Sequence, residues 1–303
     1  MTRTAPPPEL QIGGSSRVVD TTLVMGVVNA SPESFSDAGR LTDRSQRIEL
    51  AHELVEAGAD VVDVGGQSAI TNRPEIHPDL EIERVVPIVS WLRREHPDVL
   101  VSVDTYKPRV VEAVLDAGAS IINDVSGLRH PEIVESCAAH RAALVVMHTE
   151  APPKVRLQDR DLYDDVGDRV RAFLAERVRA IVELGLPEAS IIVDPGPDFT
   201  KTPAQTVEVL RRVPELRALG RPLLLALSRK DFLGAITGRS PLGREAATGA
   251  AIAWFASQPG SIVRVHDVRA ARDVIATTEV LAGLRDLDPD ELLPDELRHE
   301  PPA

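Results

Sequence analysis

Residues 101–127 read VSVDTYKPRVVEAVLDAGASIINDVSG, and this stretch contains the repeating unit of the whole chain. It opens on an apolar, β-branched run that ends at Asp104 and closes on a second such run that ends at Asp124. Between the two runs lie a stretch of helical period and the turn signal DAGAS. Because neither run alternates with polar residues, each is expected to be buried on both faces, as parallel strands under helices are. The stretch therefore predicts a strand–helix–strand unit.

The same alternation of short apolar runs and longer helical stretches continues along the chain. Eight such units within about 260 residues match a (β/α)8 TIM barrel in number and size. A doubly wound open sheet is the alternative, which the lack of a Gly-rich dinucleotide fingerprint after the first strand disfavours. The predicted strands are LVMGVVN (23–29), DVVDVGG (60–66), VLVSVD (99–104), SIIND (120–124), ALVVMH (143–148), SIIVDP (190–195), PLLLALS (222–228) and SIVRVHD (261–267).

The two ends of the chain lack this alternation. Residues 1–21 are polar and Pro-rich and are predicted to form a flexible segment. Residues 287–303 are acidic and Pro-rich and are predicted to form a solvated tail. The single domain, a (β/α)8 barrel, is therefore expected over residues 22–286.

Charge and composition narrow the range of partners. The formal net charge is −13, which disfavours nucleic acid and anionic membrane as main partners. The first residues have neither the apolar core of a signal peptide nor a membrane-spanning stretch. The chain has one cysteine, Cys137, which excludes an internal disulfide and fits a reducing compartment. We expect a cytoplasmic protein that acts on small molecules.

The carboxyl ends of the predicted strands carry the candidate site residues, because TIM-barrel enzymes place their active sites there. One polar residue at such an end is equally well explained as a helix cap. Polar groups at nearly all eight ends favour a functional mouth instead. The residues are Asn29, Gly65, Gly66, Asp104, Asn123, Asp124, His148, Asp194, Ser228, Lys230, Arg264 and His266.

One group of these residues suits a flat heterocycle rich in N–H groups. Asp104, Asn123, Asp194 and Lys230 are expected to line one mouth. A carboxylate accepts two parallel N–H bonds from a guanidine-like edge, as it does from arginine.

A second group suits an anion. Arg264 and His266 lie two residues apart in a strand, so both side chains point to the same side. Asn29 belongs to the first strand, which becomes the neighbour of the last when the barrel closes. Two side chains that can carry positive charge and an amide predict a phosphate site, for which the guanidinium geometry is suited.

Together these motifs resemble the dihydropteroate synthase family, pterin-binding (β/α)8 enzymes of folate synthesis. The resemblance covers residues 22–280. Besides the stretch quoted above, it rests on MGVVNASPESFSDAG (25–39), GADVVDVGGQS (58–68), VVMH (145–148), IIVDPGPDFTK (191–201), LSRKDFLG (227–234) and RVHDV (264–268).

The resemblance implies a transferase that joins 6-hydroxymethyl-7,8-dihydropterin pyrophosphate to p-aminobenzoate, releases pyrophosphate and uses Mg²⁺. It also implies a homodimer. For the pterin it implies the ligands Asp104, Asn123, Met147, Asp194 and Lys230. For the pyrophosphate it implies Asn29, Arg264 and His266, with Asn29 also on the metal. For the p-aminobenzoate pocket it implies Phe35, Phe199 and Ser228, and for catalysis Asp37, Lys230, Arg264 and His266.

The second strand–helix loop departs from the family pattern. After the two glycines the family has Glu-Ser-Thr-Arg-Pro-Gly, whereas this chain has QSAITNRP (67–74). Ala69 and Ile70 thus stand where Thr and Arg are expected, and Arg73 follows three positions later. Two further hypotheses stay open: a paralogue that uses another nucleophile, and a non-catalytic pterin binder or methyltetrahydrofolate-type transferase. Arg264 and His266 speak against the methyltransferase, which has no anion to hold.

Overall fold

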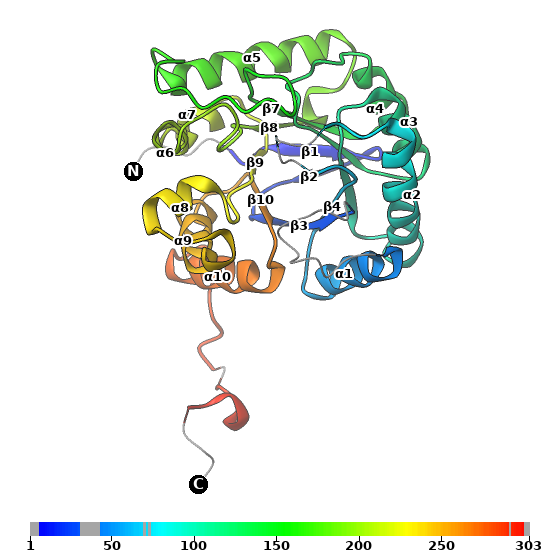
Figure 1. Cartoon of the computed structure of the whole chain (residues 1–303). Helices are drawn as coiled ribbons and strands as arrows, with labels where there is room; N and C mark the ends of the chain where they lie inside the picture. The colour runs from blue at the N-terminus through cyan, green and yellow to red at the C-terminus, as the bar shows by residue number, and fades with distance from the viewer. Residues whose placement is uncertain (1–5, 31–42, 69–70, 72–73, 291, 300–303) are drawn as a thin grey trace.

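The computed structural model describes residues 6–30, 43–68, 71, 74–290 and 292–299. Eight parallel strands close into one barrel in the order β10-β3-β4-β5-β6-β7-β8-β9, with helices around the outside (Figure 1). The (β/α)8 prediction is confirmed, and the open sheet is excluded. The strands are β3 (Leu23–Asn29), β4 (Val61–Gly65), β5 (Leu100–Asp104), β6 (Ile121–Asp124), β7 (Ala143–Met147), β8 (Ile191–Asp194), β9 (Leu223–Leu225) and β10 (Ser261–Val265).

Local sequence signals start several of the surrounding helices. Pro78, Pro108 and Pro203 each open a helix, where the missing backbone N–H costs no hydrogen bond. Along the described residues, no helix has the length and apolarity needed to cross a membrane. The helices are α1 (Arg44–Glu56), α2 (Pro78–Glu95), α3 (Pro108–Asp116), α4 (Ile133–His140), α5 (Val166–Glu183), α6 (Pro203–Arg211), α7 (Val213–Arg217), α8 (Asp231–Thr237), α9 (Glu245–Ala256) and α10 (Val268–Leu281), with short 3-10 turns η2 (Glu188–Ser190), η3 (Pro241–Gly243) and η4 (Asp295–Leu297).

The barrel strands pack between two hydrophobic cores, one against the surrounding helices and one around the barrel axis. Residues such as Val24, Val62 and Val263 face the helices and join one large aliphatic core. Their alternate neighbours face the barrel axis, because successive strand residues point to opposite sides. This inner cluster consists of Leu10, Val19, Leu23, Met25, Val61, Ile121, Ala143, Val145, Ile192, Leu224 and Ile262. It fills the amino-terminal half of the barrel and leaves the carboxyl-terminal half to other residues.

Part of the N-terminal segment forms regular structure, which the prediction of a flexible stretch over residues 1–21 did not include. Its described part contains an antiparallel hairpin of β1 (Glu9–Ile12) and β2 (Ser15–Val18). Gly13 and Gly14 join the strands with φ of 62° and 83°, as a two-residue hairpin turn requires. Leu10 and Val19 are each 1% exposed and belong to the inner cluster. The hairpin therefore closes the amino-terminal end of the barrel, and the Gly-Gly pair was the signal for it.

The C-terminal residues extend beyond the barrel. α10 ends at Leu281, five residues before the predicted domain boundary at 286. In Figure 1 the chain after α10 leads away from the barrel, and η4 is its one helical turn among the described residues.

Candidate active site

The inside of the barrel changes from apolar to polar toward the carboxyl ends of the strands. Asp63, Ser102, Asn123 and Arg264 each follow a residue of the inner layer by two positions on β4, β5, β6 and β10. Asp63 is fully buried and joins the other three. It accepts hydrogen bonds from Arg264 Nε at 2.7 Å, Ser102 Oγ at 2.6 Å and Asn123 Nδ2 at 3.3 Å. Asp63 was not among the predicted site residues, although it lies two residues before Gly65, one of the predicted strand-end positions.

Two carboxylates lie near this cluster. Asp104 ends β5, and its Oδ2 accepts from Arg264 Nη2 at 3.3 Å. Burial raises the pKa of Asp104 to about 7; the Arg264 guanidinium opposes this rise and the Asp63 carboxylate adds to it. Asp194 ends β8 and accepts from Gly196 N at 2.7 Å. Burial raises its pKa to about 6. Both carboxyl groups therefore titrate near neutral pH.

The strand register places the predicted pterin ligands beside one another. Asp104 pairs with Asn123 across β5 and β6, and Met147 pairs with Asp194 across β7 and β8. The Oδ1 atom of Asn123 is buried and has no hydrogen-bond donor among the described residues. An unsatisfied buried acceptor costs about 1–3 kcal/mol. A ligand N–H that reached this oxygen would remove that cost.

Lys230 and Phe199 form one wall of the mouth. The Lys230 amine lies 4.4 Å from the centre of the Phe199 ring and donates to the Pro197 carbonyl at 3.1 Å. Burial lowers the pKa of Lys230, and the Asp198 and Asp194 carboxylates oppose this. The structure thus brings together the two residues that were predicted to lie beside the two substrates.

Arg264 on β10 and His266, which directly follows it, differ in their charge states. His266 Nδ1 lies 2.9 Å from Ser228 Oγ. Burial lowers the pKa of His266 to about 3, and the charges of Arg229, Arg264 and Lys230 lower it further, so the ring is neutral at pH 7. Arg264 is charged but faces the Asp63 and Asp104 carboxylates. Of the two side chains that can carry positive charge, Arg264 is therefore charged and already paired, and the His266 imidazole is neutral.

Of the remaining predicted residues, the structure describes Asn29 but not those of the first and second loops. Asn29 is the last residue of β3 and pairs with Gly65, which in turn pairs with Asp104. Phe35 and Asp37 lie outside the described residues. So do Ala69, Ile70 and Arg73, the positions at which the second loop departs from the family pattern.

Comparison with known proteins decides the family. The model of the pterin binding enzyme family matches residues 25–266. The dihydropteroate synthase of Synechocystis sp. is 37% identical over 262 residues, which cover 86% of this chain and 90% of that protein.

The chain belongs to the dihydropteroate synthase family.

Two further relatives extend the likeness. A probable bifunctional folylpolyglutamate synthase/dihydropteroate synthase of Haloferax volcanii is 41% identical over 264 residues, which cover 87% of this chain and 31% of that longer protein. A solved dihydropteroate synthase of Xanthomonas albilineans with 4-aminobenzoic acid superposes with a TM-score of 0.82 at 36% identity, over 91% of this chain and 98% of that one.

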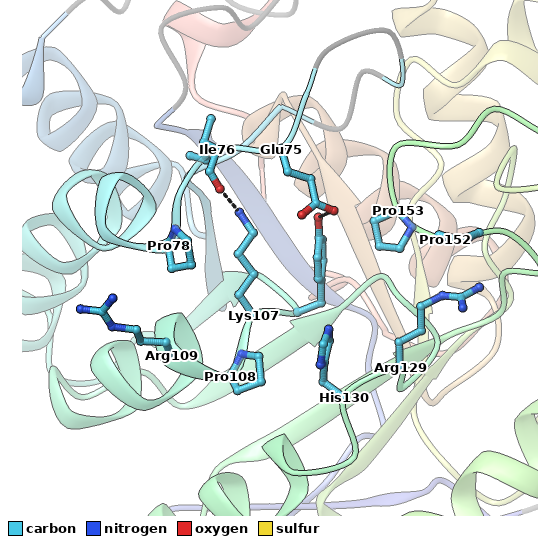
Figure 2. A pocket seen from close by; sticks show the side chains of 11 residues that line it. Glu75, Ile76, Pro78, Lys107, Pro108, Arg109, Arg129, His130, Pro152 and Pro153 are labelled. Carbon is cyan, nitrogen blue, oxygen red and sulfur yellow. Dashed lines mark hydrogen bonds between the residues drawn. The ribbon is translucent and has the colours of Figure 1, made fainter.

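A cavity of about 420 Å³ lies on the rim of this dihydropteroate synthase family barrel, where the second loop returns (Figure 2). Gln67 Nε2 donates to Tyr106 Oη at 3.0 Å, and Gln67 Oε1 accepts from Ile76 N at 2.8 Å. Tyr106 Oη donates to Glu75 Oε1 at 2.7 Å, and Lys107 Nζ donates to the Ile76 carbonyl at 2.6 Å. Gln67 thus ties the start of the second loop to its end, using both ends of an amide where the family has a carboxylate.

Two of the predicted strand-end residues have other surroundings. Asp124 accepts from Ser126 N and Leu128 N, each at 2.7 Å, and so holds the turn after β6. His148 is fully buried behind β7, and its Nδ1 lies 2.8 Å from the Lys201 amine. Lys201 was not predicted as a site residue; its only sequence signal is the last position of IIVDPGPDFTK.

Proposed function

We propose that this protein is a transferase that condenses 6-hydroxymethyl-7,8-dihydropterin pyrophosphate with p-aminobenzoate. The arylamine nitrogen bonds to the pterin methylene carbon while the bond from that carbon to the pyrophosphate oxygen breaks. The amine proton passes to the pyrophosphate or to water. The products are dihydropteroate and pyrophosphate, as family membership leads us to expect.

The observation that carries this proposal is the buried, unsatisfied Oδ1 of Asn123 beside two raised-pKa carboxyl groups. Asp104 and Asp194 can each accept N–H bonds from the amino-pyrimidine edge of a pterin. Binding of such an edge would satisfy Asn123 and repay the burial of both carboxylates. Met147, 1% exposed and next to Asp194, offers a flat ring an apolar, polarisable surface.

The leaving group needs positive charge where negative charge develops. Arg264 carries five N–H donors, of which the structure engages Nε with Asp63 and one Nη2 hydrogen with Asp104. Its other N–H groups can face a pyrophosphate, while Asp63 fixes the direction of the guanidinium. Neutral His266 contributes a hydrogen bond through Nε2, with Nδ1 engaged by Ser228.

One reaction tests the proposal. The protein is mixed with dihydropterin pyrophosphate and p-aminobenzoate, and pyrophosphate and dihydropteroate are measured. Formation of both in equal amounts supports it. Binding of the pterin pyrophosphate without dihydropteroate, but with turnover on another amine or acid, would favour a paralogue with a different second substrate. If the pterin pyrophosphate does not bind, the site assignment is wrong.

A variant tests the anion site. Arg264→Ala is expected to weaken binding of the pyrophosphate ester by at least about tenfold more than binding of the bare pterin alcohol, because a charge-assisted hydrogen bond contributes about 1.5–3 kcal/mol. Equal losses for the two ligands, measured by calorimetry, would remove the pyrophosphate from this site.

We also propose Mg²⁺ as the cofactor, held by Asn29 together with pyrophosphate oxygens. Among the described residues, no three His, Cys, Asp or Glu side chains gather as metal ligands. Mg²⁺ fits such a site, because it keeps several waters and takes one or two protein oxygens plus substrate phosphates. When bound, the ion would neutralise pyrophosphate charge. Calorimetric titration of pyrophosphate with and without Mg²⁺ tests this, and Asn29→Ala should abolish the difference.

We propose a homodimer formed through α9 and α10. A groove of about 690 Å³ lies between these helices and is lined mainly by small and aliphatic residues such as Ala250, Ala253 and Val274. Trp254 on α9 is 70% exposed and Leu281 on α10 is 83% exposed, which is unusual for side chains of this size. A second copy of the chain that presents the same face would cover them.

We propose a cytoplasmic location as well. The one cysteine, Cys137, is buried and free, and burial raises the pKa of its thiol to about 12. Unpaired thiols are typical of a reducing compartment. Fractionation of cells that produce the protein tests this.

A further inference from the structure

Lys201 is a buried lysine whose amine contacts no carboxylate among the described residues. Its side chain has no exposed surface, and it forms no ion pair within the part of the chain that the structure describes. Its amine contacts the Gly196 carbonyl at 3.0 Å, the Phe199 carbonyl at 3.0 Å and His148 Nδ1 at 2.8 Å. An ammonium has three N–H donors, so these three acceptors match it one to one. Burial lowers the pKa of Lys201 to about 7, and the charges of the Asp194, Glu150 and Asp198 carboxylates oppose this.

The two carbonyls belong to a turn with an unfavourable backbone. Gly196, Asp198 and Thr200 have φ of 64°, 66° and 52°. Glycine is required at the first position, because a Cβ there would come within 2.3 Å of the His148 carbonyl oxygen. The other two positions, Asp198 and Thr200, carry side chains in the left-handed region, which residues other than glycine adopt rarely. A turn of this kind keeps its shape only when the surrounding structure holds it.

The same turn carries one wall of the active site. The Phe199 ring lies under the Lys230 amine at 4.4 Å, and the Pro197 carbonyl accepts from that amine at 3.1 Å. Asp198 Oδ2 accepts from Asp231 N at 2.5 Å, at the start of α8. A shift of the turn would therefore change the position of the Phe199 ring relative to the Lys230 amine.

His148 has a charged pair on its other side. Its Nε2 lies 3.3 Å from Glu150 Oε1 but makes no hydrogen bond among the described residues, and Glu150 accepts two hydrogen bonds from Arg169 on α5, at 2.6 Å and 3.1 Å. In a neutral ring protonated at Nε2, Nδ1 is the acceptor for Lys201. Burial and the charge of Lys201 lower the pKa of His148 to about 4, so the ring stays neutral in this role.

We propose that Lys201 is a positioning residue: it holds the turn of residues 196–199 in its strained form and thereby sets the place of Phe199 and Lys230 for the second substrate. The effect on that substrate rests on the proposed function, whereas the effect on the turn does not. Only four of the 34 basic residues are lysines, and Lys107, Lys154, Lys201 and Lys230 all follow barrel strands at the carboxyl end. An arginine at 201 would bring a larger, planar fork to a site shaped for a compact head.

The small number of lysines makes a direct test practical. Protein labelled with ¹³C at lysine Cε gives four signals, and variants at each lysine assign them. Lys230 lies over an aromatic ring, so its signal reports the distance to Phe199. In Lys201→Met the Lys230 signal is expected to move, while those of Lys107 and Lys154 stay in place. Arg217→Met is the matched control, because Arg217 is a part-buried cation bonded to the Pro259 carbonyl at the other end of the barrel.

Kinetics provide the second readout. Lys201→Met is expected to raise the KM for p-aminobenzoate by roughly tenfold or more, as a misplaced wall would, and to change dihydropterin pyrophosphate affinity less than threefold. Arg217→Met should lower thermal stability without either effect. If Lys201→Met does not fold, His148→Leu removes one of the three acceptors and should shift the Lys230 signal in the same direction by a smaller amount.

The two readouts separate the two ideas. A Lys230 signal that stays in place in folded Lys201→Met and in His148→Leu would overturn the positioning role, whatever the enzyme does. A shifted Lys230 signal in Lys201→Met, together with a wild-type protein that makes no dihydropteroate, would support the positioning role and remove the proposed function.

Discussion

Asp63 is the residue whose replacement should cost the most free energy of unfolding for the smallest change in shape. In Asp63→Asn the side chain keeps its size and one oxygen. Arg264, however, loses the negative charge of the fully buried Asp63 carboxylate, which lies 2.7 Å from its Nε. At an effective dielectric constant near 20, a pair at that distance attracts by about 6 kcal/mol. Removal of one partner from a buried pair typically costs about 3–5 kcal/mol.

Part of this loss is recovered within the site. Arg264 keeps its hydrogen bond to Asp104 at 3.3 Å. The free-energy cost of burying the Asp63 carboxylate away from water is also absent in the variant. We therefore expect Asp63→Asn to lower the free energy of unfolding by about 2–4 kcal/mol. Urea unfolding monitored by circular dichroism measures this, provided that the slope against denaturant is unchanged.

Asp60→Asn is the matched control for this variant. Asp60 also meets an arginine, Arg272, at 2.6 Å, but both side chains are partly exposed, at 25% and 33%. A pair in that setting contributes about 1 kcal/mol or less. If Asp63→Asn costs no more than Asp60→Asn, the reasoning that makes Asp63 the centre of the polar layer is refuted.

The same variant has a consequence for proton binding. The Asp63 charge is one of the causes that raise the pKa of Asp104, so Asp63→Asn should lower it from about 7. Pterin binding that requires ionised Asp104 would then persist to lower pH. Fluorescence titration of a pterin between pH 5 and 9 measures the inflection, and an unmoved inflection would contradict the coupling.

Four further predictions follow from the structure. Leu10→Ala should lower the free energy of unfolding by about 2–4 kcal/mol in urea titrations, because Leu10 belongs to the inner cluster, whereas exposed Val18→Ala should change it by about 0.5 kcal/mol or less. Phe199→Leu should raise the KM for p-aminobenzoate about threefold to tenfold in initial-rate assays, through loss of the cation–π contact with Lys230; an unchanged KM would place the arylamine elsewhere. Asp104 has a folded-state pKa raised from 3.8 to about 7, so the folded chain binds more protons in that window and the stability that this group contributes is lost as pH rises through about 7; calorimetric unfolding should show Asp104→Asn with a flatter stability profile between pH 4 and 7. Trp254→Glu should convert the proposed dimer to monomer in sedimentation velocity, and a wild-type monomer would remove the proposed interface.

Much of the fold could be predicted from local pattern alone. All eight strands lie within the stretches predicted for them, because buried parallel strands read as short apolar runs between helical ones. The hairpin of residues 9–18 was missed because its strands are short and mostly exposed, and composition outweighed the Gly-Gly turn. The arrangement of Asp104, Asn123, Met147 and Asp194 followed from strand ends, since the register of a closed barrel brings them to one mouth.

The charge states of the site could not be predicted in the same way. Arg264 lies on β10 and His266 directly follows that strand, yet the first is paired and the second is neutral. His266 is neutral because burial removes water from the ring. Arg264 is paired because Asp63, which lies 201 residues earlier in the chain, accepts a hydrogen bond from it. Neither desolvation nor a partner so distant in sequence is visible in a local motif. Lys201 was missed for the same reason: its three acceptors are His148, which directly follows β7, and two carbonyls of the turn at residues 196–199.

The amino-acid sequence by itself determined the barrel, the end of the barrel that carries the site and most of the side chains that line it, because alternation and strand-end position are properties of neighbouring residues. Only the tertiary structure decided which charges survive there, which carboxyl groups titrate near pH 7 and how the turn at residues 196–199 is held. Those properties depend on burial and on contacts between separate strands, and both exist only once the barrel has closed.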